Sequence, residues 1–195
     1  MRSLINSWDE YLVLWVNAQH TAFLDDLMWL VSSKWLIVPL LLWLVLLLRN
    51  QKKTGKEIAM LLLFGTFMII LCDVISTQLF KEVFHRFRPS HNVKIAEQLH
   101  YHLFSDGSPY VGGKYGFVSS HAANFAGFVA FFWSFFRASW MRWTLVALVV
   151  LVMYSRMYLG VHYLTDLLVG AMLGAFIGYF MRRYVLTRFV IISKE

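Results

Sequence analysis

The sequence contains little charge, little proline and almost no cysteine. Charged residues make up 15% of its 195 residues, and there are three prolines and one cysteine. A soluble domain carries about a quarter charged residues, so this shortage indicates a chain that avoids water. Cys72 has no cysteine to pair with, and because it lies in an apolar run we interpret it as a small buried side chain. The first residues lack the small-residue cleavage site of a signal peptide, so we do not expect their removal.

Apolar residues are correspondingly abundant, at 59% of the chain. Several apolar runs approach the length that crosses a bilayer, and they are continuous, which favours helices. The sequence therefore predicts an all-α, polytopic transmembrane helical bundle of five to six spans, folded as a single domain over residues 1–195. The clear spans are Trp35–Leu48, Ile58–Phe80, Val118–Phe136, Trp143–Tyr154 with its neighbours, and Leu164–Tyr184.

The N-terminal segment, residues 1–34, does not fit a simple span. It is apolar and aromatic, but five polar residues interrupt it: Asn17, Gln19, His20, Asp25 and Asp26. We interpret it as an interfacial helix followed by a short or tilted helix. A sixth span requires that Phe23–Val31 crosses the membrane with help from its neighbours.

The formal net charge of +7 could indicate a nucleic-acid partner, but the basic residues flank the apolar runs. Basic clusters occur at residues 49–56, 137–142 and 182–188, and alternating spans place all three on one side. The positive-inside rule assigns that side to the cytoplasm. The loop region 81–117 and the stretch Ser155–Asp166 then share the non-cytoplasmic interface. We expect no nucleic-acid partner, and nothing in the sequence indicates an obligate protein partner.

The first polar motif ends the second apolar run. Lys81 and Arg88 are seven residues apart, so they can share a helical face, although Pro89 biases Arg88 away from helical geometry. Two cations here can bind an anion. The alternative is a basic belt at a helix end whose side chains reach the membrane surface.

The second polar motif, Ser119-Ser120-His121, opens the next long apolar run after a glycine-rich approach. Serine is a preferred N-cap, and a helix N-terminus presents unpaired N–H groups to an anion. The alternative is a plain helix cap, with His121 as an interfacial residue.

The third polar motif lies between the last two apolar runs. His162 and Asp166 are four residues apart and share a helical face, and Arg156 precedes them. A carboxylate on one ring nitrogen fixes the histidine tautomer and leaves the other nitrogen basic. The alternative is a structural pair that ties two helices together, although ionisable groups at membrane depth are usually functional.

Together these motifs supply three cations, two histidines, one carboxylate and a helix N-terminus, all on one face by the predicted topology. That inventory is typical of phosphoryl transfer, in which Arg, Lys and N–H donors hold phosphate oxygens. The aspartate-paired histidine attacks phosphorus and the other protonates the leaving oxygen. A metal site fits less well, because Asp166 is the one well-placed carboxylate and the cations would repel a divalent ion. We expect neither a metal nor another cofactor.

The order and spacing of the motifs resemble the type 2 phosphatidic acid phosphatase family, which is related to vanadium haloperoxidases. The resemblance covers Lys81–Asp166 and rests on three motifs. The first is Lys81 followed after six residues by Arg88-Pro89, the second is Ser119-Ser120-His121, and the third is Arg156 with His162 and Asp166. The resemblance implies that His162 is the nucleophile that forms a phosphohistidine, with Asp166 as its partner and His121 as the general acid. It also implies phosphate binding by a further set of residues: Lys81, Arg88, Ser119, Ser120 and Arg156.

Two residues depart from the family pattern. Val118 stands where the family usually has proline, and Ser120 stands where it often has glycine. Neither change removes a chemical group, because Ser120 still presents its backbone N–H. The two departures affect the backbone geometry at the start of the helix that is predicted to follow Ser119.

These observations predict a metal-independent membrane lipid phosphatase of a bacterial inner membrane, with its site facing the periplasm or exterior. Undecaprenyl diphosphate is the expected substrate, and lipid A and phosphatidylglycerophosphate are the alternatives. Two other classes compete, namely a vanadate-dependent haloperoxidase and a non-enzymatic lipid transporter or scramblase. The loop Ser90–Lys114 is expected to discriminate headgroups. Five of its residues could contact them, although a role as solvated loop residues is favoured for each: His91, Lys94, His100, His102 and Asp106.

Overall fold

The computed structural model describes residues 2–186 and 188, and it is helical, as the sequence predicts. The longer helices are α1 (Arg2–Asn17), α2 (Ala22–Ser32), α3 (Ile37–Asn50), α4 (Gly55–Val74), α6 (Ser120–Phe132), α7 (Ser139–Tyr158) and α8 (Leu164–Met181). The shorter pieces are α5 (Glu82–Phe84), 3-10 turns at Lys34–Leu36, Pro89–His91, Ala96–Gln98 and Trp133–Phe135, and π-helical turns at Ile75–Lys81 and Arg182–Leu186. Within the described part of the chain, β structure is limited to two isolated bridges, Phe87 with Tyr115 and Leu103 with Pro109.

Three helical stretches are long and apolar enough to cross a membrane, namely Gly55–Phe84, Ser139–Tyr158 and Leu164–Tyr184. A fourth span results if α2 and α3 are counted together, although the two helices are bent by 57° where they meet. The predicted span over Val118–Phe136 contains only 13 residues of α-helix, as α6. Most α6 side chains are buried against neighbouring helices, so α6 belongs to the protein core. The described chain thus supports three or four spans, and a count of five to six stays a prediction.

Helices α6 and α8 touch through their backbones. A Cβ atom on Gly174 would lie 1.9 Å from the carbonyl oxygen of Ala123, and one on Gly178 would lie 2.2 Å from that of Gly127. Small residues four apart allow membrane helices to approach this closely. This contact brings the N-terminal ends of α6 and α8 together, and the second and third polar motifs lie at those ends.

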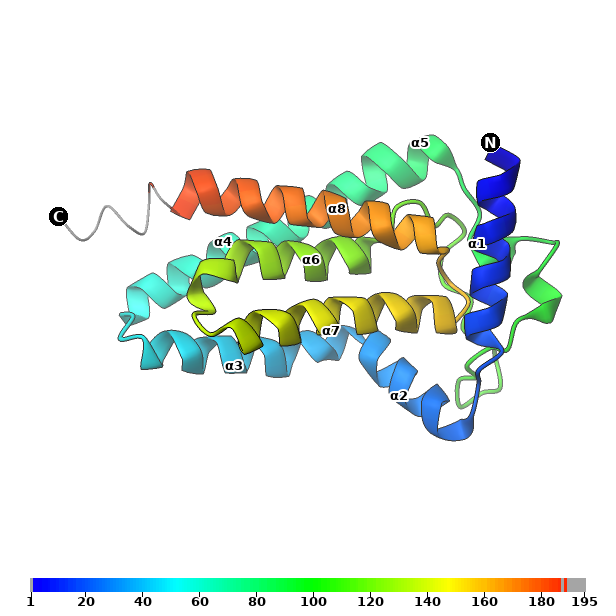
Figure 1. The fold of residues 1–195 in the computed structure, drawn as a ribbon, viewed down its shortest axis with the longest axis horizontal. Helices are drawn as coiled ribbons and strands as arrows, with labels where there is room; N and C mark the ends of the chain where they lie inside the picture. Colours follow the sequence, from blue (N-terminus) through cyan, green and yellow to red (C-terminus); the bar gives the residue numbers. More distant parts are fainter. Residues whose placement is uncertain (1, 187, 189–195) are drawn as a thin grey trace.

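The N-terminal segment forms two helices, and its place at the membrane interface stays a prediction. Helix α1 lies across the ends of α7 and α8 (Figure 1), and it is followed by the short helix α2. Asn17, at the end of α1, is buried and donates from its side chain to the backbone oxygens of His100 and Tyr158, at 2.8 Å and 2.7 Å. These bonds attach α1 to the loop region and to the end of α7.

The two ends of the bundle differ in composition. The α3–α4 turn, the α6–α7 turn and the C-terminal end of α8 lie at one end (Figure 1), and these are the places where the basic clusters occur. The long loop before α6, the end of α7 and the start of α8 lie at the opposite end. The chain therefore separates its basic turns from its three polar motifs by the length of the bundle, as the alternating-span argument predicts.

Candidate active site

A cavity of about 580 Å³ lies at the end of the bundle where the polar motifs meet. Six of the eight residues predicted for the site line this cavity: Lys81, Arg88, Ser120, His121, Arg156 and His162. They come from the end of the α4 stretch, the following loop, the start of α6, the end of α7 and the α7–α8 connection. The other two predicted residues, Ser119 and Asp166, are buried beside the cavity and do not line it.

Lys81 and Arg88 do not share a helical face, which agrees with the predicted effect of Pro89, although both side chains reach the cavity. The helix ends at Phe84, His85 takes a left-handed conformation with φ of 48°, and Arg88 is extended with ψ of 160°. The extended conformation before Pro89 is the expected one, because the proline ring disfavours helical geometry in the preceding residue. The helix break, rather than a common face, turns Arg88 toward the cavity.

Each cation in the cavity is held by neighbouring polar groups. Lys81 Nζ donates to Ser120 Oγ at 2.7 Å, and Arg88 Nε donates to the backbone oxygen of Tyr115 at 3.1 Å. Burial, followed by repulsion from Arg156, lowers the pKa of Arg88 to about 10, so this side chain stays charged at neutral pH. Arg156 is 3% exposed, donates to Ser32 Oγ and to Tyr110 Oη, and its Nε has no partner within the described chain. Three fixed positive charges therefore face one cavity.

Helix α6 begins as the second motif predicts. Ser119 is the N-cap, and its hydroxyl accepts a bond from the backbone N–H of Ala122 at 3.5 Å. The backbone N–H of Ser119 donates to the backbone oxygen of Asp166 at 3.0 Å. The hydroxyl and the N–H of Ser119 therefore both form bonds within the protein. Ser120 and His121 line the cavity from the first turn of α6. The hydroxyl of Ser120 also lies 2.7 Å from that of Ser76.

His162 and Asp166 lie close together, at an atom separation longer than a hydrogen bond, but they do not share a helical face, because His162 precedes α8. His162 Nδ1 lies 3.5 Å from Asp166 Oδ2 and has no hydrogen-bond partner among the described residues. Both side chains are almost fully buried. Burial, and then the positive charges of Arg88 and Arg156, hold the pKa of His162 well below the usual histidine value. The imidazole is consequently neutral at pH 7, and its Nε2, on the far side of the ring from Asp166, can act as a base or nucleophile.

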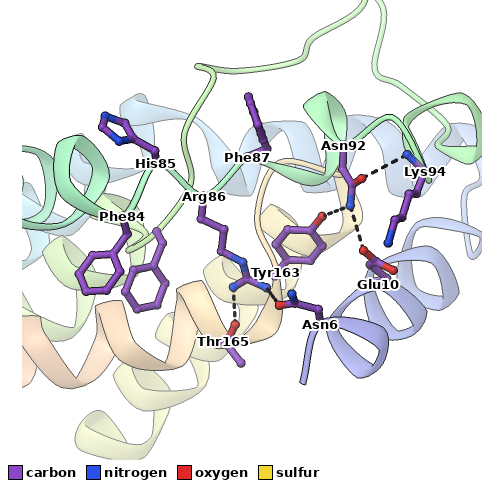
Figure 2. A pocket seen from close by; sticks show the side chains of 11 residues that line it. Asn6, Glu10, Phe84, His85, Arg86, Phe87, Asn92, Lys94, Tyr163 and Thr165 are labelled. Atoms are coloured by element: carbon purple, nitrogen blue, oxygen red, sulfur yellow. Dashed lines mark hydrogen bonds between the residues drawn. The ribbon is translucent and has the colours of Figure 1, made fainter. Parts of the chain in front are cut away.

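Arg86 is a member of the site that the sequence reasoning passed over. Its Nη1 donates to Asp166 Oδ1 at 2.7 Å and to Thr165 Oγ1 at 2.6 Å. Its Nη2 donates to Asp9 Oδ2, also at 2.7 Å, and Figure 2 shows Arg86 with its partner Thr165. The second oxygen of Asp166 accepts from the backbone N–H of Tyr163 at 3.1 Å. The carboxylate beside His162 is therefore fixed by donors on both oxygens.

Glycine is required at two positions because the backbone there lies very close to side chains of the site. Gly112 has φ of +65°, and a Cβ atom there would lie 2.7 Å from Arg88 Nη1. A Cβ atom on Gly116 would lie 3.0 Å from Arg88 Cγ and 3.1 Å from Asp166 Oδ2. Only glycine fits at either position without moving a residue of the site.

The loop Ser90–Lys114 contributes Tyr110, Gly112 and Gly113 to the cavity, and none of its three histidines. His100 lies 3.1 Å from Asp25 and stacks on His20, and His102 stacks on Trp29. These rings attach the loop to α2 and the preceding turn. In the described residues, no group of three His, Cys, Asp or Glu side chains is arranged to hold a metal ion.

A second and larger cavity, of about 780 Å³, is lined by Arg86 and Tyr163 and by none of the eight predicted residues (Figure 2). Its central polar groups are already paired with one another, because Asn92 Nδ2 donates to Glu10 at 3.0 Å and to Tyr163 Oη at 2.9 Å. The smaller cavity, with three cations and two histidines, is the one equipped for chemistry. It can hold a phosphate between the cations with a neutral imidazole beside the phosphorus atom.

Comparison with known proteins agrees with this geometry. Residues 58–189 match the model of the PAP2 superfamily. The chain is 34% identical over 175 residues to a lipid A 4'-phosphatase of Porphyromonas gingivalis, a match that covers 90% of this chain and 72% of that protein. It is 30% identical over 182 residues to a lipid A 4'-phosphatase of Bacteroides thetaiotaomicron, covering 92% of this chain and 77% of that protein.

Two crystal structures share the fold. LpxE of Aquifex aeolicus superposes with a TM-score of 0.59 at 21% identity, covering 89% of this chain and 94% of its own. A PAP2 type phosphatidylglycerolphosphate phosphatase of Bacillus subtilis superposes with a TM-score of 0.62, also at 21% identity, covering 95% and 88%. The family match spans more than half of the chain and includes all eight predicted residues. The chain therefore belongs to the PAP2 superfamily, as a membrane lipid phosphatase.

Proposed function

We propose that this protein removes a phosphate group from lipid A or a closely similar acylated sugar phosphate, through a phosphohistidine intermediate. The observation that carries the reaction is the neutral, buried His162 in a cavity that it shares with Lys81, Arg88 and Arg156. The substrate class is supported by the two lipid A 4'-phosphatases that resemble this chain over about nine-tenths of its length. These relatives favour the alternative from the sequence over undecaprenyl diphosphate, the substrate first expected.

The proposed reaction has two steps. The lone pair of His162 Nε2 attacks phosphorus, the bond from phosphorus to the leaving oxygen breaks, and His121 gives that oxygen its proton. A water molecule then attacks the phosphohistidine while His121 takes its proton, which releases phosphate and restores His162. The three cations hold the non-bridging oxygens, where negative charge is greatest in the transition state.

Asp166 has the role of holding the imidazole in position. Its Oδ2 faces Nδ1, so the proton of the neutral ring belongs on Nδ1 and the lone pair on Nε2. A carboxylate also stabilises the positive charge that the ring gains when Nε2 bonds to phosphorus. The separation of 3.5 Å would shorten as that charge develops.

Phosphate release by the purified full-length protein in detergent tests the proposal. We expect release from lipid A, with a product lighter by one phosphate in mass spectrometry and the 4'-position as the first place to examine. Undecaprenyl diphosphate and phosphatidylglycerophosphate should be poorer substrates at equal concentration. If either of these lipids were hydrolysed faster than lipid A, it would replace lipid A as the proposed substrate, and the proposed reaction would be unchanged.

The rival classes predict different outcomes in the same assay. A lipid transporter or scramblase would release no phosphate from any lipid, because its His162–Asp166 pair would be structural only. A haloperoxidase would need added vanadate and would oxidise halide in the presence of peroxide. Phosphate release without vanadate, lost in His162→Ala, is expected here and excludes both.

We also propose that the cavity opens on the non-cytoplasmic side of a bacterial inner membrane. The supporting observation is the separation of the basic turns from the polar motifs at opposite ends of the bundle. Single cysteines placed at Val93 or Ser105, in a Cys72→Ala background, provide the test. An impermeant thiol reagent should label them on spheroplasts, and labelling that requires lysis would reverse the orientation.

A further inference from the structure

The cavity of the candidate active site has two unlike ends. Its cationic end holds the predicted phosphate-binding side chains, while the rest of its wall includes apolar residues of the membrane-spanning helices such as Ile69, Ile70 and Val74. Two more polar side chains line it, Asp73 from α4 and Asn124 from α6. The proposed phosphate chemistry uses neither of them.

The position of these two residues follows from one contact. The hydroxyls of Ser76 and Ser120 lie 2.7 Å apart and set the register between the α4 stretch and α6, which run in opposite directions (Figure 1). Asp73 precedes Ser76 by three residues, and Asn124 follows Ser120 by four. Both therefore stand about one helical turn, roughly 5 Å, farther from the cationic end of the cavity and on the same level.

The carboxylate of Asp73 and the carboxamide oxygen of Asn124 both lack a partner among the described residues. The carboxamide oxygen of Asn124 is buried without a hydrogen-bond partner in the described chain. Asp73 is exposed and forms no ion pair with a described residue, although it lies in an apolar helix that is long enough to span the membrane. Unpaired polar groups at this depth are costly and are usually retained for function.

We propose that Asp73 and Asn124 form a specificity site that accepts hydrogen bonds from the substrate, one turn behind the phosphate. An ionised carboxylate only accepts hydrogen bonds, and a carboxamide oxygen does the same. The matching ligand is a phosphate ester whose carbon skeleton carries a hydroxyl or amide N–H group within a few atoms of the ester oxygen. Sugar and glycerol phosphates have this chemistry, whereas a phosphate joined directly to a hydrocarbon chain does not.

This site rests on the proposed function and sharpens it. A substrate with the donor group satisfies two acceptors that a plain hydrocarbon would leave unpaired. Sites built to hydrogen-bond a substrate hydroxyl discriminate strongly against analogues that lack it. Because Asp73 stays partly open to the cavity, we expect a difference in kcat/KM of about 10- to 100-fold, smaller than in fully enclosed sites.

A pair of lipids that differ by one hydroxyl tests the proposal. The substrates are 1-O-hexadecylglycerol 3-phosphate and its 2-deoxy analogue, assayed with the full-length protein in mixed micelles. The wild-type protein should prefer the hydroxyl-bearing lipid by at least about tenfold in kcat/KM. Asp73→Leu and Asn124→Leu should each reduce that ratio, and the double variant should bring it close to one.

Asp26→Leu is the matched control, because Asp26 is an exposed acidic residue of α2 that does not line the cavity. Its ratio should equal that of the wild-type protein. Equal hydrolysis of the two lipids by the wild-type protein would overturn the specificity site while leaving the phosphatase intact, and this comparison needs no variant to fold. A wild-type preference that persists in the double variant would also overturn it. Absence of phosphate release from both lipids, with release from lipid A retained, would overturn the specificity site as well, and absence of release from lipid A too would reject the proposed function.

Discussion

Arg86 and Asp166 form a direct ion pair behind the candidate nucleophile, with Nη1 2.7 Å from Oδ1. The carboxylate is fully buried, so its position depends on this partner and on the backbone N–H of Tyr163. The same guanidinium binds Asp9 of α1 through its other terminal nitrogen. The orientation of His162 is thereby connected to a helix at the far end of the sequence.

Replacing Arg86 should slow catalysis without abolishing it. Arg86→Met leaves Asp166 with one donor fewer, so the imidazole is held less firmly, and kcat should fall by about 10- to 100-fold. Arg86→Lys should recover part of the lost kcat, because an ammonium group can bind one of the two carboxylates, Asp9 or Asp166. Arg142→Met, at the opposite end of the bundle, is the control for general loss of stability and should keep wild-type kcat. Equal kcat for Arg86→Met and wild-type protein would show that the ion pair serves only the fold.

Loss of the nucleophile should be far more severe. His162→Ala should lower kcat by several powers of ten, and Asp166→Asn should lower it strongly while the protein stays folded. Phosphate release and thermal unfolding of the purified variants provide the measurements. A well-folded His162→Ala protein with near-normal activity would rule out the phosphohistidine mechanism.

The two histidines should respond differently to the leaving group. A general acid matters most when the departing oxygen is basic, as in an alkyl or sugar phosphate, and little for p-nitrophenyl phosphate. His121→Ala should therefore impair a lipid phosphate much more than the nitrophenyl ester. His162→Ala should impair both substrates alike, because both need the nucleophile. Equal losses for His121→Ala on the two substrates would remove the case for His121 as the acid.

The acidic limb of the pH profile should lie below the usual titration range of histidine. Burial and the nearby cations disfavour the imidazolium form, so the pKa of His162 is lowered and the ring stays neutral and active as the pH falls. Arg88→Met removes one of these cations, which should raise that pKa and move the acidic limb of kcat/KM to higher pH. The measurement is the pH profile of kcat/KM for both proteins with p-nitrophenyl phosphate. A shift of the acidic limb to lower pH in Arg88→Met would contradict the proposed effect of the cations on His162.

Chelation should leave the activity unchanged. Three cations occupy the places where a two-metal phosphatase has carboxylates. Phosphate release should therefore proceed equally with and without excess EDTA. A loss on chelation that Mg²⁺ restores would show that a metal takes part in the reaction.

The sequence predicted the contents of the site better than its geometry. Spacing alone identified His162 and Asp166 as neighbours, although His162 precedes α8 and only Asp166 lies in its first turn. Arg86 was overlooked because its partners, Asp9 and Asp166, come from opposite ends of the chain, and no local pattern joins them. Tyr110 was overlooked for a similar reason, as a single tyrosine in a polar loop gives no sign that its hydroxyl meets Arg156.

The membrane architecture was predicted in outline. The helical character and the separation of basic turns from polar motifs followed from composition and from the order of the apolar runs. The break after Phe84 did not, because local hydropathy does not register the left-handed conformation of His85 at which the helix ends. The glycines of α8 at 170, 174 and 178 were also overlooked, although small residues four apart indicate a close helix contact.

The bridge that Arg86 makes between Asp9 and Asp166 also bears on how the protein is made. Asp9 leaves the ribosome with the first helix, and Asp166 leaves it with the last one. The nascent chain therefore passes through most of membrane insertion before both carboxylates that bind Arg86 are present, and before the proposed nucleophile His162 has been made. The proposed site is therefore incomplete until α8 has been made, and the ion pairs of Arg86 are completed only when the two ends of the polypeptide have come together.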